Sequence, residues 1–532
     1  MLNTYLQNLP ITIVGQEQLE GLDSNIALVR LQNKHLALMV RSNDADSWEP
    51  FYPMGMETGF WDSRCYADID YNQVFENYRK LGANSCWFML HWSDIEPERD
   101  YFDFRFTDSI VEAARKQDIK ICWAFFTHAH CNDPNLNKDD FWAYRLDSSS
   151  GKDHAVQWLK DDKGNIYDNI DKLNTVDQME IFPCYSHPVV FERIQLVLQE
   201  VARHYRHSET VIGIQIGNEE GFLQAPLKDG YDSDYNPYTM ELYEQWKNSG
   251  KSSWAAFKEF MVKKWWRHFT TAFHKEDPYK LTTFNLFAGY PEKGWPDAIF
   301  RTGTDITTYG EGNVDAIGTM FYDKDCDPVW ENLDRHYDCT CSLPIFIPSE
   351  IGLGIHSTNS FVLSQHFLIK TLARGAQGFD IYAYGHFFNE GQEINNYGIV
   401  LKNWNSMIRA CLDIIWSGLP GYGDIKLETT VKGAAINGLT GLDGSALGIL
   451  HYPEAWREED ADASTEAADV KVNMQVVNSG EYHMVVYRDG TVVQSERLFL
   501  YHSLSVEIQL RDVPKKSMSF IKIWKLESLE RK

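Results

Sequence analysis

The sequence predicts an α/β protein: a (β/α)₈ TIM barrel that follows a short N-terminal β segment and precedes a C-terminal all-β sandwich. Short apolar runs alternate with longer amphipathic stretches from about residue 50 to residue 415, as expected for such a barrel. The apolar period then falls to two residues, which is typical of an antiparallel sandwich. Eight apolar runs predict the barrel strands, and they start at Phe51, Asn84, Ile119, Val211, Leu281, Val314, Pro344 and Gln377.

Amphipathic stretches between these runs predict helices. Residues 72–81, 191–206 and 361–374 each carry apolar side chains along one helical face. Gly82 and Gly375 follow the first and the last of these stretches, where helices commonly end on a glycine. A doubly wound sheet is the main alternative. It needs a glycine-rich phosphate turn after its first strand, and the sequence PMGMETGF at that place lacks this pattern.

Three domains are predicted: the N-terminal β segment over 1–48, the catalytic barrel over 49–420 and the β-sandwich over 421–532. In the last domain apolar residues alternate with polar ones, and Arg488-Asp489-Gly490 has the composition of a hairpin turn. Two mostly polar stretches, 128–185 and 220–250, follow barrel strands. We expect both insertions on the face where barrels hold their active sites.

Charge and cysteine content restrict the partners and the compartment. The formal net charge of -26 predicts an acidic surface, which repels nucleic acid phosphates and anionic membranes. No apolar stretch approaches the length of a membrane span. The first twenty residues lack the pattern of a secretory signal, and the nine cysteines include no CxxC pair. We therefore expect a cytoplasmic protein with free thiols. The oligomeric state stays open, a homo-oligomer included.

Two glutamates lie where barrel chemistry takes place. Predicted strand four ends in Asn218-Glu219, and Glu350 ends what we count as strand seven. Strands four and seven lie across the mouth of a barrel, so their ends face each other over a bound sugar. Glycoside hydrolysis needs one protonated and one ionised carboxyl group on either side of the scissile bond. The pair therefore predicts glycosidase chemistry, against the alternative that each is an exposed or ion-paired carboxylate.

The chain resembles the clan A glycoside hydrolases, and within them the barrel β-galactosidases of families 42 and 35. Asn218-Glu219 looks like the acid/base motif of the clan, and Glu350 like its nucleophile. The stretch Asn84–Phe104, NSCWFMLHWSDIEPERDYFDF, resembles the family segment after strand two, although Asp100 stands where that motif usually has glycine. Arg374-Gly375-Ala376-Gln377-Gly378 resembles the segment entering strand eight. The resemblance covers roughly residues 50 to 415.

By this resemblance, Glu219 is the acid/base, Glu350 is the nucleophile, and Asn218 donates a hydrogen bond to the sugar 2-hydroxyl. Tyr322, at the end of strand six, resembles the tyrosine that holds the nucleophile, and a barrel-wall aromatic is the alternative. Four further residues are expected near the substrate. Trp92 is expected to stack on a sugar or to pack in the core, and Glu57 to bind hydroxyls or to lie on the surface; His128 and Tyr382 complete the set.

The sequence thus predicts a retaining, exo-acting β-glycosidase without a cofactor. A β-galactosidase acting on an oligosaccharide or glycoside is the first expectation, and a β-glucosidase or β-mannosidase is the alternative. A barrel that binds glycans without cleaving them is a second class of function. His128-Ala129-His130 follows strand three and leaves a metal-dependent hydrolase as a third. We expect no catalytic metal, because later strands offer glutamate and tyrosine in place of further histidines.

Overall fold

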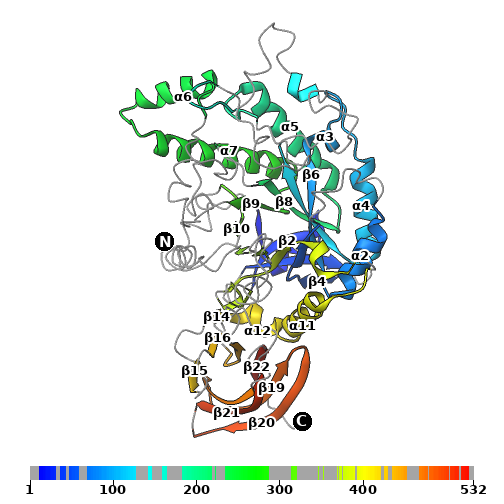
Figure 1. Cartoon of the computed structure of the whole chain (residues 1–532), viewed down its shortest axis with the longest axis vertical. Coiled ribbons are helices and arrows are strands. Elements are labelled where there is room, and N and C mark those ends of the chain that lie inside the picture. Colours follow the sequence, from blue (N-terminus) through cyan, green and yellow to red (C-terminus); the bar gives the residue numbers. More distant parts are fainter. Residues whose placement is uncertain are drawn as a thin grey trace.

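The fold is taken from a computed structural model of the whole chain, in which two lobes are joined by helices (Figure 1). One lobe contains a parallel sheet with helices outside it, and the other is a β-sandwich. None of the described helices is long and apolar enough to cross a membrane. The structure describes residues 11–31, 36–42, 47–58, 69–127, 142–145, 159–164, 183–218, 222, 234–286, 313–319, 345–346, 351–352, 368–369, 371–373, 375–389, 392–420, 425–428, 434–441, 443–451, 467–476, 478–502, 504–514 and 517–526.

The larger lobe is organised by one sheet whose pairings are all parallel. Its strand order is β11-β10-β9-β8-β7-β6-β5-β13-β12. Each of the eight predicted strands coincides with a described strand, and the seventh corresponds to the two short segments β11 and β12. The strands are β5 (Met54–Glu57), β6 (Ser85–His91), β7 (Lys120–Phe126), β8 (Val211–Asn218), β9 (Leu281–Leu286), β10 (Ala316–Thr319), β11 (Ile345–Phe346), β12 (Ile351–Gly352) and β13 (Phe379–Tyr382).

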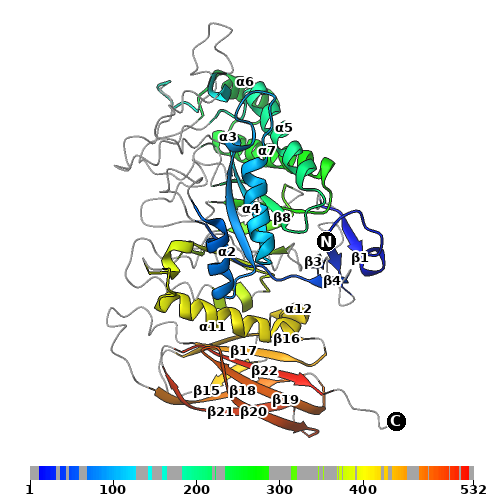
Figure 2. The same cartoon turned by 90° about the vertical axis from the view of Figure 1, so that its right-hand side faces the viewer.

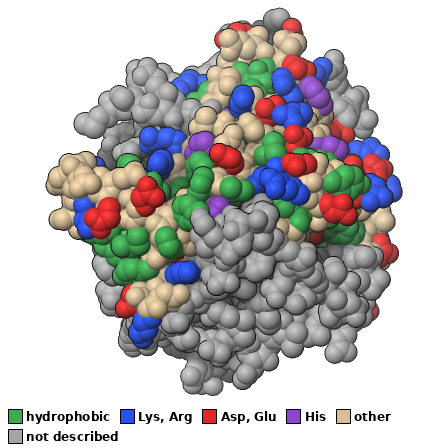
Figure 3. Space-filling view, turned by 90° about the horizontal axis from the view of Figure 1, so that it is seen from above, with side chains coloured by type: hydrophobic (Ala, Val, Ile, Leu, Met, Phe, Trp, Pro, Cys, Tyr) green, Lys and Arg blue, Asp and Glu red, His purple; other side chains and the backbone are tan. Residues whose placement is uncertain are grey.

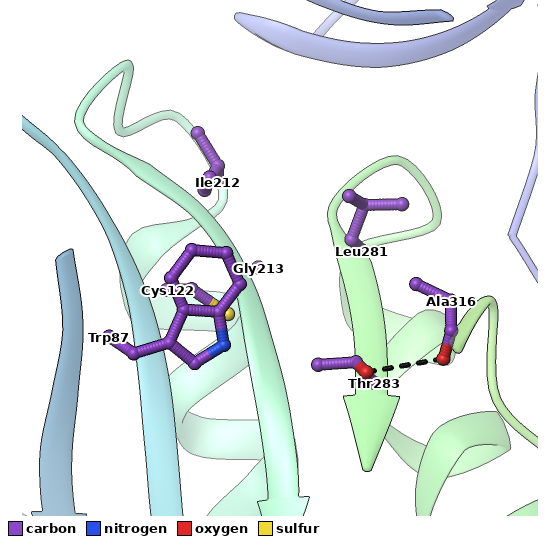
Figure 4. Close-up of a pocket in the computed structure, with 7 residues that line it drawn as sticks. All are labelled: Trp87, Cys122, Ile212, Gly213, Leu281, Thr283 and Ala316. Atoms are coloured by element: carbon purple, nitrogen blue, oxygen red, sulfur yellow. Dashed lines mark hydrogen bonds between the residues drawn. The ribbon is translucent and has the colours of Figure 1, made fainter. Parts of the chain in front are cut away.

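The sheet is strongly curled. Side chains from the five consecutive strands β6 to β10 line a single small void (Figure 4). Strands in a flat sheet lie about 4.8 Å apart, so the outer two of five would be about 19 Å from each other. They meet around one void only if the sheet curves around it. The lining residues are Trp87, Cys122, Ile212, Gly213, Leu281, Thr283 and Ala316.

Helices cover the convex side of this sheet. The predicted helix over 72–81 is confirmed as α2, and Gly82 ends it with a φ of 74°. The predicted helix over 191–206 is confirmed as α5. Of the third predicted helix, residues 368–369 and 371–373 are helical, and the rest lies outside the described residues. The α-helices of this lobe whose bounds are described are α2 (Tyr71–Lys80), α3 (Trp92–Ile95), α4 (Arg105–Lys116), α5 (Pro188–Tyr205), α6 (Pro237–Lys247) and α7 (Trp254–Glu276).

A small N-terminal sheet closes one end of the curled sheet. It contains β1 (Ile13–Gly15), β2 (Ile26–Arg30), β3 (Leu36–Ser42) and β4 (Ser47–Pro50) in sequence order. Leu28 and Leu38 belong to the same buried cluster as Trp87 and Ile212, which lie near the amino ends of β6 and β8. The opposite end, at the carboxyl ends of the strands, is therefore the end that remains for a site.

The second lobe is a sandwich of two antiparallel sheets, ordered β14-β16-β17-β22-β19-β20 and β15-β18-β21. Val472, Met484 and Ile508 lie in the buried cluster between the sheets, as the alternation predicts. The predicted hairpin joins β19 to β20, and Asp489 and Gly490 both have positive φ there, at 47° and 83°. The strands are β14 (Gly418–Pro420), β15 (Ile425–Glu428), β16 (Ala435–Gly441), β17 (Ala446–His451), β18 (Ala467–Gln475), β19 (Gly480–Arg488), β20 (Thr491–Leu500), β21 (Ser505–Pro514) and β22 (Ser519–Lys525).

The helices α11 (Asn396–Ala410) and α12 (Leu412–Ser417) lie between the two lobes (Figure 2). The ring of Trp404 on α11 meets that of Phe520 on β22 edge-on, with centroids 5.2 Å apart. Lys522 Nζ donates to Asp413 Oδ1 and to Ala410 O, both at 2.7 Å. The sandwich is thus packed against the larger lobe through a buried aromatic contact.

We expect the substitution Phe520→Ala to lower the free energy of unfolding by about 3–5 kcal/mol, because it leaves a cavity between the lobes. Urea unfolding followed by tryptophan fluorescence measures this loss. The control Val493→Ala changes a residue that is about half exposed, and it should cost no more than about 0.5 kcal/mol. A loss below about 1 kcal/mol for Phe520→Ala would contradict the packing described here.

Candidate active site

Parallel pairing brings the carboxyl ends of the strands to the same edge of the sheet. Glu57 ends β5, His91 ends β6, Asn218 ends β8 and Tyr382 ends β13. Asn285, next to the last residue of β9, pairs directly with Asn218 across the ladder. Three of these positions, Glu57, Asn218 and Tyr382, are among those that the sequence predicts. His91 and Asn285 are additions from the structure.

Several predicted site residues lie outside the described residues: Glu219, Glu350, Tyr322 and His128. The same holds for the side chain of Asn218, although its backbone belongs to β8. In the chain, Glu219 is the residue after β8, and Glu350 is the residue before β12. Because β12 pairs with Ile381 and Tyr382 at the end of β13, both glutamates adjoin described positions at the carboxyl edge.

Glu57 lies inside the protein with 2% of its surface exposed. The alternative of a surface carboxylate is therefore wrong for this residue. Tyr382 is half-buried, and its ring meets that of His386 edge-on, with centroids 6.1 Å apart. Burial lowers the pKa of His386, which favours the neutral imidazole beside this tyrosine.

Trp92 has a packing role. Its side chain is only 2% exposed, its indole N–H donates to Glu96 Oε2 at 2.9 Å, and its ring meets Trp142 edge-on. A ring that stacks on a sugar must present one open face, and this one is enclosed. Of the two roles that the sequence leaves open for Trp92, the structure favours packing over sugar stacking.

Glu96 is the centre of a buried polar cluster behind the β6 end. It accepts hydrogen bonds from Trp92 and from the backbone N–H of Asp100, and it is ion-paired with Arg193 on α5. Arg193 Nη1 also donates to Asp100 Oδ1 at 2.7 Å, and its guanidinium lies over the ring of Trp142. Burial lowers the pKa of Arg193. The cluster anchors the segment after β6 to the helix before β8.

The backbone at Asp100 has a conformation that suits the glycine expected there from the sequence resemblance. Asp100 has a φ of 65°, in the left-handed region that glycine adopts most easily. Aspartate tolerates this conformation better than most residues. Here its carboxylate also contacts Arg193, which a glycine at this position could not do. An aspartate thus adopts the left-handed backbone here and adds an ion pair with Arg193.

Asp380 is a buried charge that sequence analysis missed. It lies within β13, and a Cβ on Gly55 of the neighbouring β5 would come within 2.8 Å of Asp380 Oδ1. Gly55 is thus small because the carboxylate occupies that space. Burial, together with the negative charge of Asp380, raises the pKa of the Cys122 thiol well above its usual value. The only sequence signal was one charged residue inside an apolar strand.

His91 also went unnoticed in the sequence. It is buried, and its imidazole packs against Phe126 at the end of β7, with ring centroids 5.2 Å apart. Its Nδ1 lies 3.3 Å from Asp94 Oδ2, and its backbone N–H donates to the same oxygen. This contact holds the ring orientation at the carboxyl edge. A histidine directly before the Trp92 motif is the signal that could have found it.

Both predicted insertions contribute described residues to one buried node. Asp234 Oδ1 accepts from the backbone N–H groups of Lys160 and Asn236, both at 2.9 Å. Its Oδ2 accepts from Thr239 Oγ1 at 2.6 Å and from Cys184 Sγ at 3.1 Å. Burial raises the pKa of Asp234. The node thus joins described residues of both insertions through one carboxylate.

Figure 3 shows the molecule from above, and on this face acidic and basic side chains of the described residues are interspersed. Among the described residues, no three His, Cys, Asp or Glu side chains gather closely enough to hold a metal ion. His128 and His130, the candidate ligands in the sequence, lie outside that set.

Three solved structures resemble the chain in the arrangement of their elements. A β-galactosidase from the psychrophilic Marinomonas ef1 has 11% identity and a TM-score of 0.48, over 69% of this chain and 62% of its own. A family 30 endoxylanase from Clostridium papyrosolvens C71 has 11% identity and a TM-score of 0.47, over 90% and 97%. A family 30 xylanase from Clostridium acetobutylicum has 10% identity and a TM-score of 0.45, over 97% of this chain and 99% of its own.

All three of these proteins are glycoside hydrolases. No protein-family model and no curated protein matches the chain. With identities of 10–11% and TM-scores below 0.5, the chemistry of this chain has to rest on its own residues.

We expect Arg193→Met to lower the free energy of unfolding by about 3–5 kcal/mol, because it leaves the buried Glu96 carboxylate without its cation. The double variant Arg193→Met/Glu96→Gln should lose clearly less, since the uncompensated charge is gone. Urea unfolding of both single variants and the double variant gives the coupling energy. Strictly additive losses would show that the two side chains are not coupled.

Proposed function

We propose that this protein is a retaining β-glycosidase in which Glu219 is the acid/base and Glu350 is the nucleophile. The observation that carries the proposal is the pairing at the carboxyl edge of the sheet. Asn218 lies opposite Asn285, and β12 lies opposite the end of β13, so the residues next to both glutamates belong to this one edge. Two carboxyl groups at such an edge are what glycoside hydrolysis requires.

The curled sheet is proposed to be a closed (β/α)₈ barrel. Its two outermost strands, β11 and β12, come from one stretch of chain, since Phe346 and Ile351 are five residues apart. Five residues span at most about 17 Å even when fully extended. The two edges of the sheet are therefore held close to each other, with β11 on β10 and β12 on β13. Closure would place strands four and seven on opposite sides of the mouth.

The reaction follows from two carboxyl groups about 5–5.5 Å apart. Glu350, ionised, attacks the anomeric carbon, while Glu219 gives its proton to the leaving oxygen as the glycosidic bond breaks. A water molecule then gives a proton to Glu219 and attacks the glycosyl-enzyme, which releases Glu350 as a carboxylate. The neighbouring negative charge and burial favour the protonated form of Glu219 in the first step.

Further residues are proposed to bind the sugar or to hold the nucleophile. Asn218 is proposed to bind the 2-hydroxyl of the sugar, and Tyr322 is proposed to hold Glu350. Glu57 is assigned to sugar hydroxyls, because its buried carboxylate ends β5 at the same edge. The remaining lining side chains are proposed to be His91, His128, Asn285 and Tyr382.

The preferred substrate is proposed to be a terminal β-galactoside, with a β-glucoside or β-mannoside as the alternative sugar. These sugars differ in the orientation of single hydroxyl groups, which one or two polar side chains distinguish. No cofactor takes part in the mechanism above. A cytoplasmic location remains part of the proposal, and it is supported by the free thiols of the described cysteines Cys86, Cys122, Cys184 and Cys411.

The test is hydrolysis of a panel of p-nitrophenyl glycosides by the wild type, Glu219→Ala and Glu350→Ala, each with and without azide. We expect the wild type to cleave one β-glycoside best and both variants to lose at least about 10³-fold in kcat. Azide should rescue Glu350→Ala with an inverted glycosyl azide and Glu219→Ala with a retained one. Product stereochemistry is read by proton NMR.

Two controls separate the competing functions. Activity that disappears with EDTA and returns with a divalent metal would favour the metal-dependent hydrolase. Saturable glycan binding in calorimetry without hydrolysis would favour the glycan-binding barrel. Full activity in both glutamate variants would remove the pair from the mechanism altogether.

We expect a β-glucuronide to be a much poorer substrate than the matching neutral glycoside. The carboxylates of Glu57 and Asp380 are buried on the strands that form the site. A third carboxylate about 5 Å from one of them is repelled by about 3 kcal/mol at an effective dielectric constant of 20. The kcat/KM of the neutral p-nitrophenyl glycoside should thus exceed that of the glucuronide more than about 100-fold. The substitution Glu57→Gln should make this ratio smaller. Equal rates on both would contradict this account.

A further inference from the structure

Strand β8 contains an irregularity just before the proposed acid/base. Its ladder with β9 runs Gly213 to Leu281, Ile214 to Thr282 and Gln215 to Thr283, and it resumes with Asn218 opposite Asn285. Three residues of β8 therefore correspond to two residues of β9. This is the definition of a β-bulge, which adds one residue to one strand of a pair.

Gly217 supplies the backbone conformation for this bulge. Its φ is 81°, in the region that residues with a Cβ adopt only at a cost. A glycine with positive φ inside a strand, next to the extra residue, is what such a bulge requires. The glycine of Ile216-Gly217-Asn218 is therefore a requirement of the strand shape.

The bulge changes which row of the strand Asn218 belongs to. Gly213, Leu281 and Thr283 line the void on the concave side, as Figure 4 shows. Residues two apart share a face of a strand, so Asn285 belongs to the same concave row. Ile214 and Ile216 belong to the cluster on the other side, with the helices. Without the extra residue, Asn218 would continue the row of Ile214 and Ile216.

This matters because the proposed mechanism asks Asn218 to reach the bound sugar. In a regular strand neighbouring side chains point to opposite faces. With unbroken alternation after Gln215, Asn218 would therefore face the helices and could not reach the sugar 2-hydroxyl. A bulge next to an active site re-aims a side chain in this way.

We infer that Gly217 is a positioning residue, whose bulge brings Asn218 into the concave row beside Asn285, where it is placed to bind the 2-hydroxyl of the proposed substrate. The inference rests on the proposed function. It assigns no chemistry to Gly217 itself. It also accounts for the place of Asn285 beside Asn218, because the bulge pairs the two residues.

The test compares Gly217→Ala with the wild type on two substrates of the preferred sugar. For the p-nitrophenyl glycoside, whose 2-hydroxyl is the proposed partner of Asn218, we expect kcat/KM to fall at least about 100-fold, because this hydrogen bond strengthens in the transition state. For the matching 2-deoxy glycoside, which lacks that hydroxyl, the loss should stay below about 10-fold. A purely structural defect would lower both by the same factor.

Gly250→Ala is the matched control. Gly250 follows α6 with a φ of 88°, and a Cβ there would meet no atom within 4 Å. It therefore carries the same backbone penalty without contact to the site. We expect its rates on both substrates to equal those of the wild type, and its melting temperature to fall about as much as that of Gly217→Ala. A third variant, Gly217→Asn, should have a rate between those of the wild type and Gly217→Ala, because asparagine adopts positive φ more readily than alanine does.

The possible results separate the inference from the proposed function. If the wild type cleaves neither glycoside, the proposed function fails. If Glu219→Ala loses activity and azide rescues it, while Gly217→Ala keeps the wild-type ratio between the two substrates, the glycosidase stands and the inference is overturned. If Gly217→Ala does not fold, the substrate ratio of Gly217→Asn decides, and an unchanged ratio also overturns it.

Discussion

The parallel pairing of β5 to β13 is the constraint on which the rest of the molecule depends. Parallel strands align their carboxyl ends, so residues that are far apart in the chain, such as Glu57 and Tyr382, arrive at one edge. Each return to the opposite edge needs a crossover, and α2, α4, α5 and α7 provide crossovers while covering the convex side. The small N-terminal sheet packs against the amino ends of the strands. The amino ends of the strands are thereby covered by packing, and the carboxyl ends are the place of the proposed active site.

Buried carboxyl groups inside this framework have either a small residue or an oppositely charged side chain beside them. Gly55 leaves room for the Asp380 carboxylate, and Arg193 compensates Glu96 behind the end of β6. Asp234 is satisfied by two backbone N–H groups, a hydroxyl and a thiol. A buried carboxylate without such partners would be strongly destabilising. Two of these arrangements also join described segments that follow strands of the sheet, one at Glu96 and one at Asp234.

The elements were predictable from the sequence because they are governed by local rules. Apolar runs flanked by turns located the strands of the curled parallel sheet, and the glycine after 72–81 marked a helix end that the structure confirms at Gly82. The hairpin at Asp489 and Gly490 followed from turn composition alone. The candidate site was less predictable. Asp380 and His91 are single polar residues in apolar strands, and periodicity treats such residues as interruptions.

By itself the sequence determined the alternation of strands and helices, the two-residue period of the sandwich and the chain positions of Asn218-Glu219 and Glu350. Each of these depends on residues within about ten positions of one another. Tertiary structure decided that Trp92 is enclosed by its partners, that Glu57 is buried, and that Asn218 lies opposite Asn285 after a bulge. The physical reason is that burial and strand register depend on neighbours brought together from distant parts of the chain, and no local pattern in the sequence encodes which neighbours these will be.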